Sequence, residues 1–211
     1  MNSSLKIGSF LVFVALFVLA SPAYGQTPLG DPKPTPTPKD EKVILERITP
    51  FDGDVDFPEV EGWELSRKFR YPRPELGYSV NYESAEGGRV TVYVYNGGIR
   101  SIPNELTGPV AAQMRQAKAE INAAVDAGLY SSATEVSSST VTLGGVEGKV
   151  QSLHSLYVIK VKERELDSEI YVFPYENYFI KLRATRPKGP DGPKNEAIEA
   201  LLKELDKLFS H

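Results

Sequence analysis

The sequence predicts an α+β domain in which an antiparallel sheet of about six strands is covered by helices, with the element order β-β-β-α-β-β-β-β-α. Three observations support this class. Several segments alternate apolar and polar residues with a period of two and are separated by glycine turns, as strands are. Two longer segments instead have apolar residues at helical spacing. Neighbouring strands are joined by short turns, so we expect them to pair antiparallel.

Three strands are predicted in the first half of the domain, at about residues 63–71, 76–83 and 89–96. In the third strand, three valines alternate with a threonine and two tyrosines, and the turn Glu86–Gly88 precedes it, which is typical of a hairpin. The short apolar run Val43–Leu45 could add a strand before them. Residues 51–62 are acidic and are expected to form a loop.

A helix is predicted at about residues 109–129, because apolar residues recur there every three or four positions. Thr107 is the expected N-cap, and Gly128 is the expected C-terminal stop. Four strands follow, at about residues 130–143, 150–161, 169–175 and 178–185, and then a loop at 186–193 that is rich in proline and glycine. A last helix is expected at 195–209, with an apolar stripe formed by Ile198, Leu201, Leu202, Leu205 and Phe209.

The N-terminal residues are predicted to lie outside this domain. Ile7–Ala20 is an apolar run of 14 residues that follows Lys6 and precedes small residues up to Gly25. This is the layout of a signal peptide, residues 1–25, and the run is shorter than the roughly 20 residues of a spanning helix. An uncleaved anchor is the alternative. Residues 26–42 are expected to form a proline-rich tether, and a docking ligand and a glycosylated stalk are the alternatives. Residues 43–211 are expected to form a single α+β domain.

The amino-acid composition limits the compartments in which the protein can work and the partners that it can bind. The chain has no cysteine, which excludes a lipid-anchored cysteine, disulfides and thiolate metal sites. Its net charge of −4 argues against a dedicated nucleic-acid binder. We therefore predict a secreted or periplasmic protein that is not stably inserted in the membrane after cleavage.

Three stretches resemble the PsbP-like fold, which includes DcrB-like periplasmic proteins. They are the helix end Ala127–Tyr130, the turn Gly144–Lys149, and the segment Tyr178–Pro187 with the loop and apolar helix behind it. The resemblance covers roughly Trp63–Phe209, concerns architecture and lacks the lipobox cysteine of DcrB-like lipoproteins. It implies a non-catalytic binding or assembly module.

The residues that common catalytic sites need are scarce. The two histidines are His154, within a predicted strand, and the terminal His211, and no HExxH, GxSxG, Walker A or GxGxxG motif occurs. Asp52, Asp54 and Asp56 have the spacing of a calcium loop, but Phe57 and Trp63 stand where that loop needs glycine and glutamate. We predict no catalytic residue, no metal site and no cofactor, and we expect His154 to be packed against its neighbours.

One enzymatic alternative depends on acidic residues. Glu163, Glu165, Asp167 and Glu169 lie around a predicted hairpin turn, and paired carboxylates can hydrolyse glycosidic bonds. A hydrolase of envelope carbohydrate is therefore the second hypothesis. Acidic residues on the exposed side of a hairpin are the simpler interpretation.

The leading hypothesis is a non-enzymatic binding or assembly domain, with an envelope protein or glycan as its partner. Its candidate ligand-binding residues are Arg67, Arg70, Tyr93 and Tyr95, on the assumption that their strands are neighbours. Arginine and tyrosine are enriched where interfaces concentrate their binding energy. A charged strand that discourages aggregation, with half-buried tyrosines elsewhere, is the alternative interpretation.

Overall fold

A computed structural model describes residues 56–189 and 195–210. The expected α+β class is confirmed, and the sheet is antiparallel throughout. Seven strands and two α-helices follow in this order along the chain: β1 (Glu64–Arg70), β2 (Tyr78–Glu83), β3 (Arg89–Tyr95), α1 (Gly108–Asp126), β4 (Ser132–Thr142), β5 (Gln151–Val161), β6 (Arg164–Tyr175), β7 (Tyr178–Pro187) and α2 (Asn195–Phe209). Two short 3-10 helices, Pro74–Leu76 and Gly145–Glu147, lie between them.

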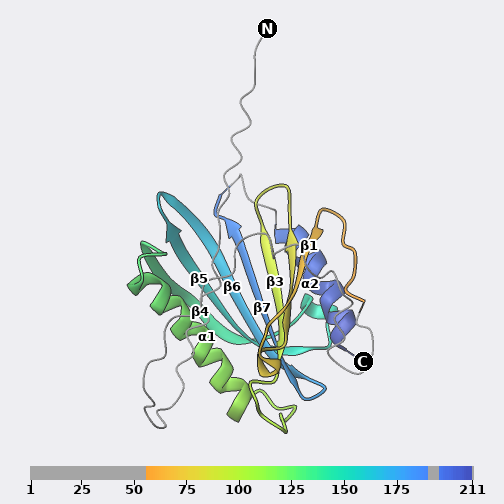
Figure 1. The fold of residues 1–211 in the computed structure, drawn as a ribbon. Coiled ribbons are helices and arrows are strands. Elements are labelled where there is room, and N and C mark those ends of the chain that lie inside the picture. Colours follow the sequence, from red (N-terminus) through yellow and green to blue (C-terminus); the bar gives the residue numbers. More distant parts are fainter. Residues whose placement is uncertain (1–55, 190–194, 211) are drawn as a thin grey trace, which may run out of the picture. The chain divides into compact units, whose positions relative to one another are not determined.

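The sheet contains seven strands where about six were expected, in the spatial order β1-β2-β3-β7-β6-β5-β4. The last strand of the chain, β7, therefore lies at the centre, where it pairs with both β3 and β6. The outer strands among the described residues are β1 and β4. Figure 1 shows α1 lying alongside β4 to β6, whereas α2 is near β1 and β3.

Each face of the sheet has its own apolar core, because several strands carry apolar side chains on both sides. One core joins α2 to strands β2, β3, β6 and β7, with Val80, Val92, Phe173 and Leu205 fully buried. The other joins α1 to β5, β6 and β7. Its members include Val110, Ile121, Ile159, Val172 and Phe179. The expectation that helices cover the sheet is thus met on both faces.

The ends of α1 lie where the sequence predicts them, and one side chain of α2 attaches that helix to the sheet. Thr107 is the N-cap residue of α1, although its side chain makes no capping hydrogen bond. Gly128 has a φ of +71° just after the helix, a conformation that favours glycine and ends the helix as expected. Within α2, the buried Asp206 accepts hydrogen bonds from the backbone N–H groups of Lys149 and Val150, at 2.8–3.1 Å. This contact fastens α2 to the start of β5.

The hairpin formed by β6 and β7 is longer than the sequence predicted. β6 begins at Arg164 rather than at about residue 169, and β7 ends at Pro187. Asp167 pairs in register with Arg186, which was expected in the following loop. The charged residues at the start of β6 hide the alternation, since both strands carry polar side chains at this end of the sheet.

Several expectations lie outside the described residues. They are the signal peptide, the tether, the strand at Val43–Leu45, and Asp52 and Asp54 of the broken calcium loop. In the part of the chain that is described, no helix is both long and apolar enough to cross a membrane.

Candidate functional site

The structure separates the four residues predicted to bind a ligand. The strand of Arg67 and the strand of Tyr93 are not neighbours, because β2 pairs with both and lies between them. Arg67 and Arg70 project to opposite faces, since Arg70 pairs with Tyr78 of the core beneath α2, whereas Arg67 pairs with Asn81. The assumption that these residues form one contact face is therefore wrong for Arg70.

Tyr95 is also unsuited to surface binding. Its ring is 6% exposed and packs in the core beneath α1, and its hydroxyl donates a hydrogen bond to Gln113 at 2.8 Å. Tyr93 is half-buried two residues earlier on the same side of β3. The ring of Tyr93 lies 4.9 Å from the ammonium of the buried Lys181, which pairs with Glu120 of α1 at 3.0 Å. This ion pair joins α1 to β7, and Gln113 extends the contact of α1 to β3.

Strands β1, β2 and β3 present what we call the open face on the same side of the sheet. It consists of Arg67 and Phe69 on β1, Asn81 on β2, and Thr91 and Tyr93 on β3. Cross-strand pairs run from Arg67 through Asn81 to Thr91, and from Phe69 through Ser79 to Tyr93. All five residues are exposed or half-buried, and neither described helix shares a core with β1 on this side.

The open face combines a cation, rings and neutral polar groups. The guanidinium of Arg67 lies 5.0 Å from the centre of the Phe69 ring, and Phe69 makes an edge contact with Tyr71. Phe69 is 37% exposed, which is unusual for a large apolar ring on a strand whose neighbours are charged. Burial raises the pKa of Tyr93 to about 12, so its hydroxyl stays protonated at neutral pH. Such a surface suits contact with a flat partner.

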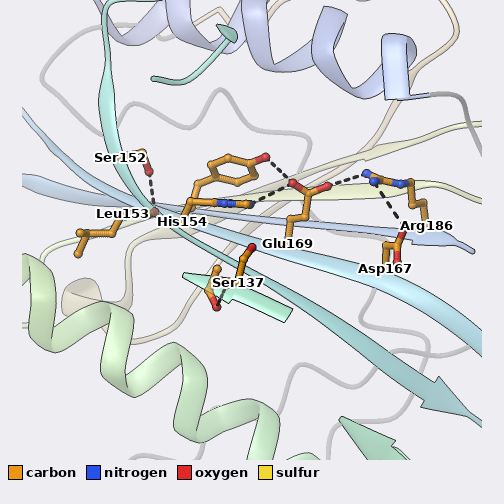
Figure 2. A network of polar contacts seen from close by, with 9 residues as sticks. Ser137, Ser152, Leu153, His154, Asp167, Glu169 and Arg186 are labelled. Atoms are coloured by element: carbon orange, nitrogen blue, oxygen red, sulfur yellow. Dashed lines mark hydrogen bonds and ion pairs between the residues drawn. The ribbon is translucent and has the colours of Figure 1, made fainter. Parts of the chain in front are cut away.

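A second polar cluster lies on the α2 side of the sheet, across β5, β6 and β7 (Figure 2). Its centre is Glu169, whose side chain is 13% exposed. One carboxylate oxygen of Glu169 accepts hydrogen bonds from His154 Nε2 at 3.1 Å and from the Tyr171 hydroxyl at 2.6 Å. The other accepts one from Arg186 at 2.6 Å, and Arg186 also reaches Asp167 at 3.6 Å. We call these five residues the Glu169 network.

These contacts decide the charge of Glu169. Burial alone would raise its pKa, but the hydrogen bonds from His154 and Tyr171 and the charge of Arg186 more than offset burial and lower the pKa to about 2. Glu169 is therefore ionised at neutral pH, with both oxygens engaged. A glycosidase pairs one carboxylic acid that holds its proton near neutral pH with one ionised carboxylate. Glu169 does not suit the first role, and the donors that occupy both of its oxygens argue against the second.

His154 is packed, as the sequence predicted. Its ring stacks against that of Tyr171 with centres 4.6 Å apart, and its Nε2 is directed at Glu169. Of the other acidic residues of the predicted cluster, Asp167 joins the network, whereas Glu163 lies at the hairpin turn with 95% of its side chain exposed. The hairpin thus places three of the four acids on one face of β6. Asp167 and Glu169 share Arg186, whereas Glu165 forms an ion pair with Lys188 at 3.7 Å.

Neither cluster has the form of a metal centre. Within residues 56–189 and 195–210, no three His, Asp or Glu side chains converge as metal ligands do. A depression is lined by residues around the start of β1, including Glu59, Glu61, Glu64 and Trp63. The indole of Trp63 donates a hydrogen bond to the backbone of Ala197 in α2 at 3.0 Å, so this ring serves to hold the helix.

Comparison with known proteins finds no protein-family model that matches the chain and no curated protein significantly similar to it in sequence. The likeness to the PsbP-like fold is therefore an expectation that depends on the stretches of sequence quoted above. The site has to be interpreted from its own geometry.

Sequence reasoning missed the Glu169 network and most of the open face. Arg186 was expected in a loop, and Phe69 was not among the four residues predicted to bind a ligand. The useful signal for Phe69 was its alternation with Arg67 on one strand, since residues two apart share a face. No comparable signal exists for the Glu169 network, because its members come from three strands whose register the sequence does not reveal.

Proposed function

We propose that this chain is an exported, non-enzymatic binding domain that contacts a partner protein through the open face. The observation that carries the proposal is the open face, where Arg67 and Phe69 are exposed side by side on β1. A second observation argues against catalysis at Glu169. The acidic group best placed for catalysis is engaged by three donors and is ionised, so it can neither donate a proton nor attack a substrate without losing its partners. We do not propose the carbohydrate hydrolase, because no observation favours it.

The residue types of the open face favour a protein partner over a small molecule. Small ligands are bound in concave pockets that bury most of their surface, whereas protein interfaces are broad and concentrate their energy in aromatic and arginine residues. Arg67 and Phe69 on β1 and Tyr93 on β3 are residues of these kinds, and the one strand between them is β2. A glycan partner is the alternative outcome of the test below.

The proposed location follows from the predicted signal peptide and tether. After cleavage near Gln26, the proline-rich residues 26–42 would act as a semi-rigid spacer of about 3.1 Å per residue. Such a spacer lets a binding domain reach a partner at a distance. The domain would therefore work in the periplasm or outside the cell.

The binding proposal is tested by substitutions on the two sides of β1. The double change Arg67→Ala and Phe69→Ala removes the cation and the ring from the open face, and we expect it to weaken partner capture at least about tenfold, the loss of one interface hot spot. Arg70→Ala is the matched control, because Arg70 is exposed on the same strand but projects to the opposite face. Each protein is immobilised as its host secretes it, and the captured proteins and glycans are quantified.

The outcomes separate the alternatives. Loss of a protein partner with the double variant and its retention with Arg70→Ala would support the proposal. Equal capture by all three proteins would contradict it, provided that circular dichroism shows that they are folded. If the double variant instead loses a bound glycan, the open face would still be the binding site, but the partner would be a glycan and not a protein.

A further inference from the structure

The outer strand β4 has an exposed edge. It is 11 residues long, it has β5 as its one neighbour among the described strands, and residues 134–140 are all exposed. Val136 is 57% exposed, although it is apolar and lies in the middle of the strand. The outer side of such a strand presents N–H and C=O groups that can pair with another strand.

The two outer strands of the sheet differ in how they are protected. β1 carries four charged residues, which is a common device against edge-to-edge pairing: Glu64, Arg67, Lys68 and Arg70. β4 carries one charged residue, Glu135, and no proline. Lys118 of α1 forms an ion pair with Glu135 and also donates to the Ser138 hydroxyl at 2.9 Å. The edge formed by β4 therefore has little net charge that could repel a second strand.

One protective feature of β4 is a bulge between Glu135 and Ser137. Beyond the bulge, residues Ser137–Thr142 pair with β5 in unbroken register. The side chains of this segment are serines, threonines and one valine, which are small or β-branched and suit a paired strand. Its outer edge is regular enough to accept another strand.

We propose that this segment of β4 pairs antiparallel with β4 of a second copy of the chain, so that two seven-stranded sheets become one. A two-fold axis perpendicular to the sheet maps each face onto itself, and residue i of one copy then lies opposite residue i of the other at the axis. With the axis at Ser139, the midpoint of Ser137–Val141, Ser139 faces its own copy and Ser138 faces Thr140.

A second copy fits this edge because the segment is complementary to itself. Ser139 faces Ser139 and Ser138 faces Thr140, so these hydroxyl groups can hydrogen-bond across the strands, whereas Ser137 faces Val141. Glu135 lies outside the paired segment. No like charges are brought face to face. The inference goes beyond the proposed function, because β4 and the open face lie at opposite ends of the sheet.

Single cysteines test the pairing directly, because the chain has no other thiol. A disulfide needs the two Cα atoms within about 4.4–6.8 Å, a distance that in this arrangement is met near the axis. Ser137→Cys, Ser138→Cys, Ser139→Cys and Thr140→Cys are oxidised under mild conditions, with the protein purified as its host secretes it. Ser66→Cys, on the exposed part of β1, is the matched control.

We expect disulfide-linked dimers to be most abundant for Ser139→Cys, to decline on either side and to be rare for Ser66→Cys. The proposal would be overturned if all the cysteine variants formed similar amounts of disulfide-linked dimer, or if none of them formed more than a little.

Self-association without a cross-link gives a second test. In sedimentation equilibrium, we expect the wild-type chain to dimerise reversibly, and the pair Ser137→Lys and Ser139→Lys to weaken the dimer at least about tenfold through like charges facing one another. The pair Ala119→Lys and Asn122→Lys adds the same charge at exposed positions of α1 and should leave the dimer intact. A wild-type chain that stays monomeric at every concentration tested would contradict the proposal. Equal weakening of the dimer by the two double-lysine variants would contradict it as well.

Discussion

Replacing Leu205 by alanine is expected to lower the free energy of unfolding by about 2–5 kcal/mol, the range for a large side chain removed from a packed core. Leu205 is fully buried between α2 and the sheet, in the core that also holds Leu201 and Phe173. The loss would be a large share of the roughly 5–15 kcal/mol that stabilises an ordinary domain. Urea unfolding monitored by circular dichroism measures it.

Lys207→Ala is the matched control for this helix. Lys207 lies two residues from Leu205 on the exposed side, where substitutions usually change stability by no more than about 0.5 kcal/mol. Removal of all residues after Pro193 should abolish cooperative unfolding, because it uncovers the whole core beneath α2. A truncated chain that unfolds at the same urea concentration as the full chain would show that α2 is not part of the folded unit.

Replacing Glu169 by alanine is the second change with a large expected effect. The substitution leaves Arg186, His154 and Tyr171 without their shared acceptor, and breaking a buried ion pair in this way costs about 3–5 kcal/mol. Val141→Ala is a suitable comparison, since it shortens a half-buried side chain of β4 that packs against the core beneath α2 and pairs with Ser152, outside the network. We expect it to cost much less than Glu169→Ala.

The contribution of Glu169 should depend on pH in a defined direction. Its pKa falls from an ordinary value of 4.5 to about 2 on folding, so the folded state favours the ionised form. The stabilisation, about 3 kcal/mol by linkage, is fully present above about pH 5 and is lost as the pH falls towards 2. The difference in unfolding free energy between wild type and Glu169→Gln should shrink over this range, as measured by urea unfolding at several pH values. A difference that does not change with pH would contradict the assigned pKa.

The elements of the fold were largely predictable because their signals are local. Val90, Val92 and Val94 alternate with polar or aromatic residues, and α2 repeats leucines at helical spacing, so each segment shows its own period. Both helices begin and end within a few residues of the predicted positions. The ends of β6 and β7 were missed, because their polar side chains satisfy one another across the hairpin and give no apolar alternation.

The sites were less predictable, since they depend on which strands are neighbours. The central position of β7 places Arg183 opposite Thr91 and Arg186 opposite Asp167, and no local pattern indicates either pairing. The intervening β2 likewise separates Arg67 from Tyr93. Asp206 illustrates the same limit within a helix. Its carboxylate is buried and accepts hydrogen bonds from backbone N–H groups of a turn that is distant in the sequence.

The central claim is that the domain binds its partner and does not turn over a substrate. The most direct test incubates the secreted wild-type chain with peptidoglycan and other envelope glycans over several pH values and measures released reducing sugar. We expect no release above that of a matched blank, because both carboxylate oxygens of Glu169 are already engaged by three donors. Release that persists through further purification, and that is abolished in a folded Glu169→Gln variant, would contradict the account and assign the Glu169 network to catalysis.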